Sequence, residues 1–455
     1  MTNLLILILI ANSMVIQNGP FHSPDADHGA ETPPAGLKGG HELGDDSRWQ
    51  ETVSSAGLKG GRESAGDPWE EAALWYRNQL RQHEVVGGAL LLLREGKVTA
   101  EGYFGYADLE TGRAVDRRTI FHWASLTKTV TAVAVMQLRD KGMLDLDDPL
   151  TRYLPEIRQI HNPYGSMDEI TIRMALNHST GLRNPTWPWG GNEPWHPFEP
   201  MHWEQLVAMF PYTEILFPPG SRHSYSNPAI IFLGRIIEQL SGDSWEVYVD
   251  KNILKPLGMH HSYFNHTPVH LRPYRTNSYI LSAGNGDGER DSSDQPGERD
   301  SSIQPGEQDP VQGSDRTRPV ARGFDFHTGI TTSNGGLNAS IEDMVRYLQF
   351  LLGRLETPHP VLERSSLEEL WVEHLPIADE DGIRSSAALS FFLEEFDGIR
   401  VIGHTGNQWS NFSYFYIHPE SGTAILGVTN TDGKYDMHRF RHEVSRKLMR
   451  KLFPR

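Results

Sequence analysis

The sequence predicts an α+β protein, an α/β sandwich in which one antiparallel sheet is flanked by helices. Three observations predict it: residues 86–108 have strand patterns, residues 386–429 have them again, and the chain between is mostly helical in pattern. Strands at both ends of a chain complete one sheet when the middle forms an insertion. We expect sheet parts at about 67–120 and 323–455 and an inserted helical part at about 121–281.

The N-terminal sheet part is predicted to hold a helix and a hairpin. Residues 68–85 have helical apolar spacing with acidic residues in the first turn. The apolar run Ala89–Leu93 precedes a Glu95-Gly96 turn signal, and Val98–Tyr106 continues with tyrosine and phenylalanine. Two such runs around a turn predict an antiparallel hairpin.

The middle and last thirds contain the other predicted elements. Residues 125–143 leave little polar face, which is typical of a buried central helix. Further helices are predicted at 170–177, 203–209, 228–240, 245–253, 341–352 and 435–452, and further strands at 386–394, 399–403, 412–418 and 423–429.

Two polar segments are predicted to lie outside the core. Residues 14–66 are rich in Gly, Pro, Ser, Asp and Glu and repeat Ala-Gly-Leu-Lys-Gly-Gly, which predicts a disordered linker. Within residues 282–318, GERDSSDQP is followed directly by GERDSSIQP, which predicts a disordered acidic insertion. The folded domain is then expected over residues 67–455.

Composition excludes several classes of function. The formal net charge is -17, most of it in the two polar segments, and no basic stripe offsets it, so we expect no nucleic-acid partner. Cysteine is absent, which excludes a thiol nucleophile, a cysteine-ligated metal and disulfides. Residues 1–13 hold a short apolar run, read as a signal segment for export to the periplasm or outside the cell. The run is too short for a stable membrane span.

Ser125-Leu126-Thr127-Lys128 is the first candidate catalytic element. Residues three apart on a helix share one face, so the hydroxyl and the amine are expected to meet. A serine needs a base to become a nucleophile, and burial against an apolar helix favours a neutral lysine. The alternative is that Ser125 only caps the helix.

Two further elements complete the candidate site. Tyr225-Ser226-Asn227 precedes a helix, and Tyr225 could carry a proton, although Asn227 could instead cap that helix. In His404-Thr405-Gly406-Asn407, the Asn407 N–H is predicted to join the Ser125 N–H in an oxyanion hole. The alternative reading is a turn that ends a strand.

Together, and in this order, the three elements resemble those of the class C β-lactamase and DD-peptidase family. Phe121–Ala124, Leu176–Leu182 and Gly335–Leu337 add to the likeness. The resemblance implies a serine hydrolase with an acyl-enzyme on Ser125, proton transfer by Lys128 and Tyr225, and substrate binding by Asn227, His404, Thr405 and Gly406. It implies no cofactor and no metal.

The resemblance leaves the substrate open between an ester and an amide or peptide. His404 replaces the lysine usual in β-lactamases, which makes esterase or D-peptidase-like action the expectation instead of true β-lactamase action. The aromatic, proline-rich residues 187–203 would suit an apolar acyl group, or would form a lid or satellite core. A catalytically silent ligand-binding or scaffold protein and an acyltransferase are the alternatives, and the sequence predicts no oligomeric state.

Overall fold

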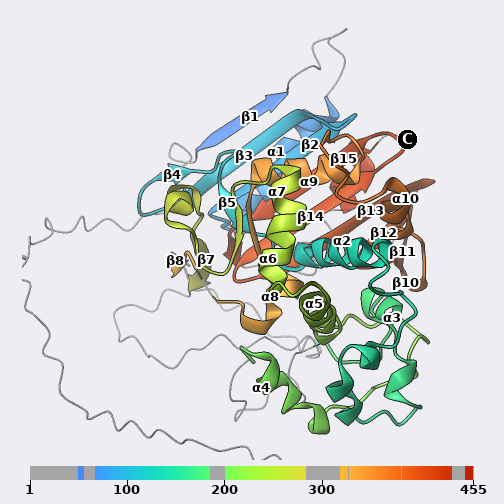
Figure 1. Cartoon of the computed structure of the whole chain (residues 1–455). Helices are drawn as coiled ribbons and strands as arrows, with labels where there is room; N and C mark the ends of the chain where they lie inside the picture. Colours follow the sequence, from blue (N-terminus) through green and yellow to red (C-terminus); the bar gives the residue numbers. More distant parts are fainter. Residues whose placement is uncertain are drawn as a thin grey trace, which may run out of the picture. The chain divides into compact units, whose positions relative to one another are not determined.

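The fold is described by a computed structural model, which covers one compact unit of the chain (Figure 1). The described residues are 50–55, 67–184, 200–282, 318–325, 327–380, 382–432 and 446–453. The predicted signal segment 1–13 therefore lies outside the described residues. So do most of the predicted linker and nearly all of the predicted acidic insertion.

Ten strands of the described residues form one antiparallel sheet, which confirms the α+β fold and its construction from both ends of the chain. The order is β1-β3-β2-β15-β14-β13-β12-β11-β10, with β4 paired to β3. The strands are β1 (Glu51–Ser55), β2 (Gly87–Arg94), β3 (Lys97–Asp108), β4 (Arg113–Ala114), β10 (Leu375–Glu380), β11 (Ile383–Ala387), β12 (Phe392–Phe396), β13 (Ile399–Gln408), β14 (Asn411–His418) and β15 (Thr423–Thr429).

β1 lies within the segment predicted as a disordered linker. Its five residues pair antiparallel with β3, with Val53 opposite Gly102. The linker prediction therefore fails for Glu51–Ser55. The strand is short and polar, so its place at the sheet edge depends on backbone pairing with β3 more than on a side-chain pattern of its own.

The strand predicted at 386–394 is wrong, because two strands occupy this region. β11 ends at Ala387 and β12 begins at Phe392. A tight turn joins them, closed by a bond from Ala388 N–H to Phe391 O at 2.9 Å. Ser390 takes a φ of 59° there, and its N–H donates to the carbonyl of Leu176 at 2.7 Å. A contact from the helical part thus sets a turn that contains no glycine or proline.

Helices cover both faces of the sheet (Figure 1). Along β2, Ala89, Leu91 and Leu93 face the core that holds α2, while Leu90 and Leu92 face the core that holds α1. Side chains of a strand alternate between the two faces, so this apolar run serves both cores. The main helices are α1 (Pro68–Gln82), α2 (Thr127–Asp140), α3 (Ile172–Leu176), α4 (Trp203–Val207), α5 (Asn227–Ser241), α6 (Trp245–Val249), α7 (Lys255–Leu257), α8 (Thr332–Gly335), α9 (Ile341–Leu351) and α10 (Arg364–Glu369).

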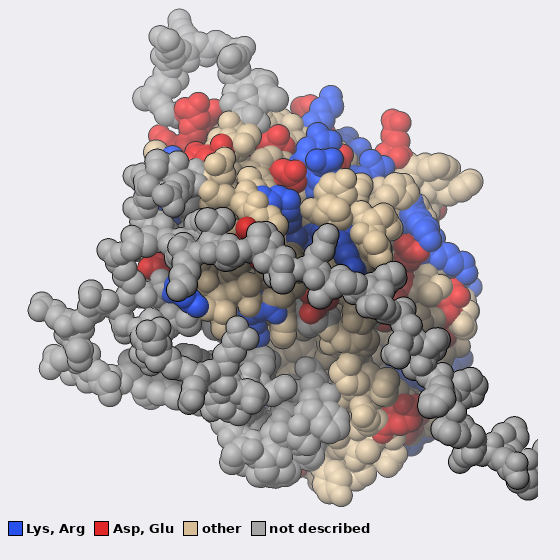
Figure 2. Space-filling model, turned by 90° about the vertical axis from the view of Figure 1, so that its left-hand side faces the viewer, with Lys and Arg blue, Asp and Glu red and all other residues tan. Residues whose placement is uncertain are grey.

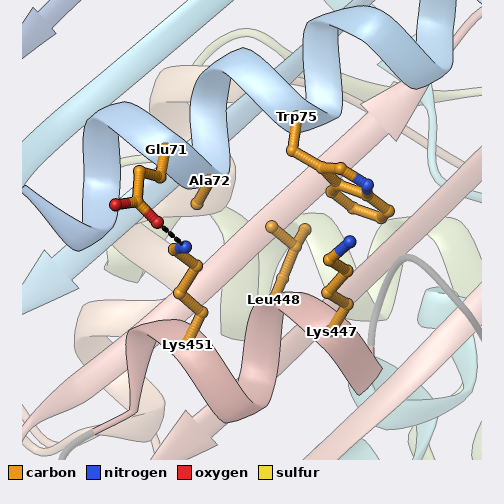
Figure 3. Close-up of a pocket in the computed structure, with 6 residues that line it drawn as sticks. All are labelled: Glu71, Ala72, Trp75, Lys447, Leu448 and Lys451. Atoms are coloured by element: carbon orange, nitrogen blue, oxygen red, sulfur yellow. Dashed lines mark hydrogen bonds and ion pairs between the residues drawn. The ribbon is translucent and has the colours of Figure 1, made fainter. Parts of the chain in front are cut away.

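The last described helical residues, 446–452, pack beside α1 (Figure 3). Lys451 pairs with Glu71, and Lys447 Nζ lies 4.5 Å from the ring centroid of Trp75. These residues line a cavity of about 220 Å³. Polar contacts thus cover the outer edge of the interface between the two helices. The rest of the predicted C-terminal helix lies outside the described residues.

Two small sheets occupy the region predicted as helical and its borders. β5 (Ile120–His122), β9 (Leu337–Ser340) and β6 (Ser262–Phe264) form one, and β16 (Thr431–Asp432), β7 (Ser278–Ser282) and β8 (Arg318–Gly323) form the other. β5, β6, β9 and β16 have two to four residues each, which is too short to show alternation in a sequence, so the sequence pattern does not predict them. β7 and β8 pair antiparallel, and the predicted acidic insertion lies between the end of β7 and the start of β8 in the sequence.

The surface of the described unit mixes both signs of charge. On the face drawn in Figure 2, lysine and arginine side chains lie interspersed with aspartate and glutamate. Arg384, for example, pairs with Glu373 and Glu395. Among the described residues, no helix combines the length and the apolar character that crossing a membrane requires.

Candidate active site

Ser125 lies in a short 3₁₀ turn, Ala124–Leu126, that leads directly into α2. Its neighbour Ala124 has a φ of 49°, a left-handed conformation that is unfavourable for a residue with a Cβ. Leu126 takes the cap position of α2, and no side chain bonds the free N–H groups there. The reading of Ser125 as a helix cap is therefore wrong, and its partly exposed hydroxyl is available for chemistry.

Lys128 lies one turn further on, where its amine meets the hydroxyl of Ser125. The distance from Lys128 Nζ to Ser125 Oγ is 3.0 Å, and Nζ also donates to the carbonyl of Asn334 in α8 at 2.8 Å. Lys128 is fully buried, and among the described residues no carboxylate contributes to the shift of its pKa. Burial in an apolar setting lowers the pKa of Lys128 well below its usual value. The amine is thus held within hydrogen-bonding distance of Ser125, and its burial favours the neutral form.

Tyr225 comes from the loop before α5 and lies against the same amine. Lys128 Nζ is 4.9 Å from the centroid of the Tyr225 ring. Rings of His178, Phe392 and His404 pack around the phenol, with centroids 4.5, 6.4 and 6.3 Å away. The structure therefore brings together the three predicted catalytic side chains, which lie up to 100 positions apart in the sequence.

β13 carries the third element and passes close to the 3₁₀ turn that holds Ser125. The strand continues to Gln408, with Thr405 opposite Tyr414 and Gly406 opposite Ser413 in β14, so the reading of residues 404–407 as a turn is wrong. A Cβ on Gly406 would stand 2.5 Å from Trp123 O and 3.0 Å from Ser125 N. Glycine is required here because the two backbones approach this closely.

His404 and Asn407 differ in exposure along this strand. His404 is buried, and its Nδ1 lies 2.6 Å from the carbonyl oxygen of Thr405. Asn407 follows Gly406 and is exposed. The strand thus brings the predicted oxyanion donor next to the segment that supplies the Ser125 N–H, and the oxyanion hole itself remains a prediction.

Asn227 lies at the start of α5 but does not cap it. Ser226 is the cap, and its hydroxyl accepts from Ala229 N–H at 3.3 Å. The side-chain amide of Asn227 donates instead to Asn184 Oδ1 at 3.1 Å. The cap prediction for Asn227 is wrong because the helix begins one residue earlier than predicted, at Asn227 itself, so that Ser226 takes the cap position. Substrate binding by Asn227 remains a prediction.

Three further rings line the site, and none was assigned a role from the sequence. His178 packs on Tyr225, and His223 packs edge-on against both His178 and Phe392, at 5.8 and 6.0 Å. Phe392 lies 4.9 Å from His404. His178 falls in the stretch 176–182 that contributes to the family resemblance, which was a usable signal. Phe392 had none, because a phenylalanine in a strand pattern indicates only packing.

Most of the predicted aromatic loop lies outside the described residues. Its last member, Trp203, begins α4 and packs against Phe210 and Phe232 in the core, at 5.8 and 5.9 Å. This packing agrees, for Trp203, with the prediction that the aromatic segment contributes to a core instead of a substrate pocket. No group of three metal-ligating side chains occurs among the described residues.

Comparison with known proteins places this geometry in a family. The Beta-lactamase family model matches residues 72–448. Esterase EstB of Burkholderia gladioli is 32% identical over 187 residues, which are 40% of this chain and 47% of EstB. The alignment thus spans less than half the length of that relative.

Solved structures show the same fold. The octameric penicillin-binding protein homologue of Pyrococcus abyssi has a TM-score of 0.63 at 23% identity, covering 84% of this chain and 79% of that chain. A class C β-lactamase has a TM-score of 0.63 at 18% identity, covering 87% of this chain and all of that chain. Because the family model matches most of the length of this chain, the chain belongs to the Beta-lactamase family.

Proposed function

We propose that this protein is a serine hydrolase that forms an acyl-enzyme on Ser125 and cleaves esters more readily than β-lactams. The observation that carries the proposal is the contact of 3.0 Å between Lys128 Nζ and Ser125 Oγ, with the lysine fully buried. A buried amine that touches a partly exposed hydroxyl, without a carboxylate to hold it charged, is suited to act as a base.

In the proposed reaction, Lys128 takes the proton of Ser125 as Oγ bonds to the substrate carbonyl carbon. The oxyanion accepts hydrogen bonds from the N–H groups of Ser125 and Asn407. The bond from carbon to the leaving oxygen or nitrogen then breaks, and the leaving group receives a proton through Lys128 and Tyr225. Water attacks the acyl-enzyme by the same route, releasing the acid and restoring the Ser125 hydroxyl.

The lining of the site supports an ester with an apolar acyl or alkyl group. Tyr225, Phe392 and His223 present aromatic rings to the site. His404 is buried at the position where β-lactamases usually have a lysine. A buried histidine beside Phe392 offers a substrate carboxylate less charge than a lysine would. The likeness to esterase EstB supports the same choice.

A labelling and activity panel tests the proposal. A fluorophosphonate should add to Ser125 of the wild-type protein and not to S125A, as read by intact mass and peptide mapping. Turnover of p-nitrophenyl esters should exceed turnover of a chromogenic cephalosporin and of a D-Ala-D-Ala peptide. Ser421→Ala, on the β14–β15 turn, is the matched control and should keep wild-type labelling. An unlabelled wild type would exclude an active hydrolase and favour the silent scaffold, and added alcohols would reveal acyl transfer.

A further inference from the structure

We infer that His178 is a positioning residue that holds Tyr225 against Lys128, an inference that rests on the function proposed above. His178 lies in the loop after α3 and touches neither Ser125 nor Lys128 through a hydrogen bond. Its contacts are with the segment that carries Tyr225. Four features of this contact support the role.

The first feature is a pair of hydrogen bonds that bracket Tyr225. The N–H of Ser224 donates to the carbonyl oxygen of His178 at 2.8 Å. The N–H of Ser226 donates to Nδ1 of the His178 ring at 3.2 Å. Residues on both sides of Tyr225 are therefore tied to one residue, so the peptide between them has little freedom to rotate.

The second feature is the packing of the two rings. The imidazole of His178 and the phenol of Tyr225 lie 4.5 Å apart at their centroids, tilted by 32°. At this separation the rings are in contact, and the imidazole supports the phenol against displacement. The amine of Lys128 lies 4.9 Å from the same phenol ring. His178 thus limits the position of the ring that Lys128 must reach.

The third feature is the protonation state that the bond to Ser226 requires. Nδ1 accepts a hydrogen bond from the Ser226 N–H, so the ring must be neutral with its own proton on Nε2. His178 is buried, and burial together with His223, Lys128 and His404 lowers its pKa well below the usual value. These groups, with the Tyr225 phenol, are the titratable groups that face the ring. The surroundings therefore keep the ring an acceptor.

The fourth feature is the backbone of His178, which has a φ of 59°. Asparagine and glycine tolerate this left-handed conformation better than other residues. The Oδ1 atom of asparagine can also take the place of Nδ1 as an acceptor, whereas glycine offers no acceptor and no ring. His178→Asn and His178→Gly are therefore a matched pair that separates the hydrogen bond from the backbone conformation.

The experiment compares the rate of fluorophosphonate labelling of Ser125, and kcat and KM for an ester, in wild type, H178N and H178G. We expect H178G to lower kcat by about ten- to a hundredfold with KM changed less than about threefold, because a misplaced proton carrier slows chemistry more than binding. H178N should recover most of the loss. Thermal midpoints measured in parallel show whether each variant is folded.

A double-mutant cycle with Tyr225→Phe distinguishes an effect of His178 on the Tyr225 hydroxyl from a purely structural role of His178. If His178 acts through the Tyr225 hydroxyl, H178G should cost less than about twofold further rate in the Y225F background. The inference would be overturned if the rate losses of H178G and Y225F multiplied in the double variant. Equal labelling rates for wild type and H178G would also overturn it. Should H178G not fold, His178→Ala enters the same cycle. If wild type is not labelled, both the proposed function and this inference fail. If wild type is labelled, the comparison of the His178 variants tests this inference alone.

Discussion

Gly406 lies so close to the turn that holds Ser125 that a Cβ on it would stand 3.0 Å from the backbone nitrogen of Ser125 and 2.5 Å from the carbonyl oxygen of Trp123. Both contacts are with backbone, which has no rotamer to change. The separation between β13 and the turn is therefore set by the absence of a side chain at one position. Donor geometry at a serine nucleophile depends on such separations to a fraction of an ångström.

Gly406→Ala should consequently impair catalysis. We expect kcat to fall by a factor on the order of 10² to 10³, the loss typical of one misplaced oxyanion donor. Turnover of p-nitrophenyl acetate measures it. Gly165→Ala is the control, because a Cβ there meets only the movable end of Glu169 at 2.7 Å. Wild-type turnover in G406A would contradict the close packing of β13 on the turn.

Lys128→Met should separate activity from stability. The substitution removes the proposed base, so we expect a loss on the order of 10²- to 10⁴-fold in kcat/KM. The free energy of unfolding should stay equal or rise, because the buried amine no longer has to be desolvated. Ester turnover and chemical denaturation measure the two effects. Lys141→Met, whose amine lies 5.7 Å from the Tyr248 ring at the other end of the helix, should leave turnover unchanged. A strongly destabilised K128M would show that Lys128 serves the fold.

The pH dependence of stability should reveal the lowered pKa of Lys128. Between its folded pKa and about 10.5, the unfolded chain binds the proton and the folded protein does not, so the free energy of unfolding rises with pH across this window. The free energy of unfolding of wild type should therefore rise relative to that of K128M, so the stability advantage of K128M shrinks as pH rises towards 10. The acylation rate should rise with pH up to the folded pKa of Lys128 and stay level above it, because the neutral amine is the base. A flat difference would mean that Lys128 titrates normally.

His122→Gln should reduce sensitivity to acid. Burial and Arg275 lower the pKa of His122 to about 4, and its ring nitrogens bond Asn338 and Gln408 at 3.2 Å. The unfolded chain binds this proton below pH 6.5, so the wild type should lose about 3 kcal/mol of stability between pH 6.5 and pH 4. H122Q lacks the titrating group and should lose correspondingly less over this interval, as measured by urea denaturation. Equal losses would place the acid sensitivity elsewhere.

Excision of the acidic insertion should leave the fold intact. Ser282 and Arg318 are cross-strand partners at the open ends of β7 and β8, so Asn-Gly in place of residues 283–317 can close the hairpin. We expect the thermal midpoint to change by no more than a few degrees and ester turnover to stay within about twofold. A tenfold loss of turnover in the folded deletion variant would assign the insertion a part in catalysis.

The sequence by itself determined the features that depend on near neighbours along the chain. The spacing from Ser125 to Lys128 is a helical turn wherever that helix lies, and the apolar run Ala89–Leu93 alternates between two faces in any strand. The sheet built from both chain ends followed from such local patterns. The order of the three motif elements pointed to their convergence, because their likeness to a known family covers all of them at once.

Only the tertiary structure decided the contacts between distant segments. The carbonyl of Asn334 that holds Lys128, the bonds from His178 that bracket Tyr225 and the turn at Ser390 that divides a predicted strand all join residues far apart in the chain. Nearly every residue has the same backbone groups, so residue type does not predict which carbonyl or N–H will form a hydrogen bond with a distant segment. Such contacts depend on how helices and strands pack, and packing is set by the whole chain and not by any one stretch of it.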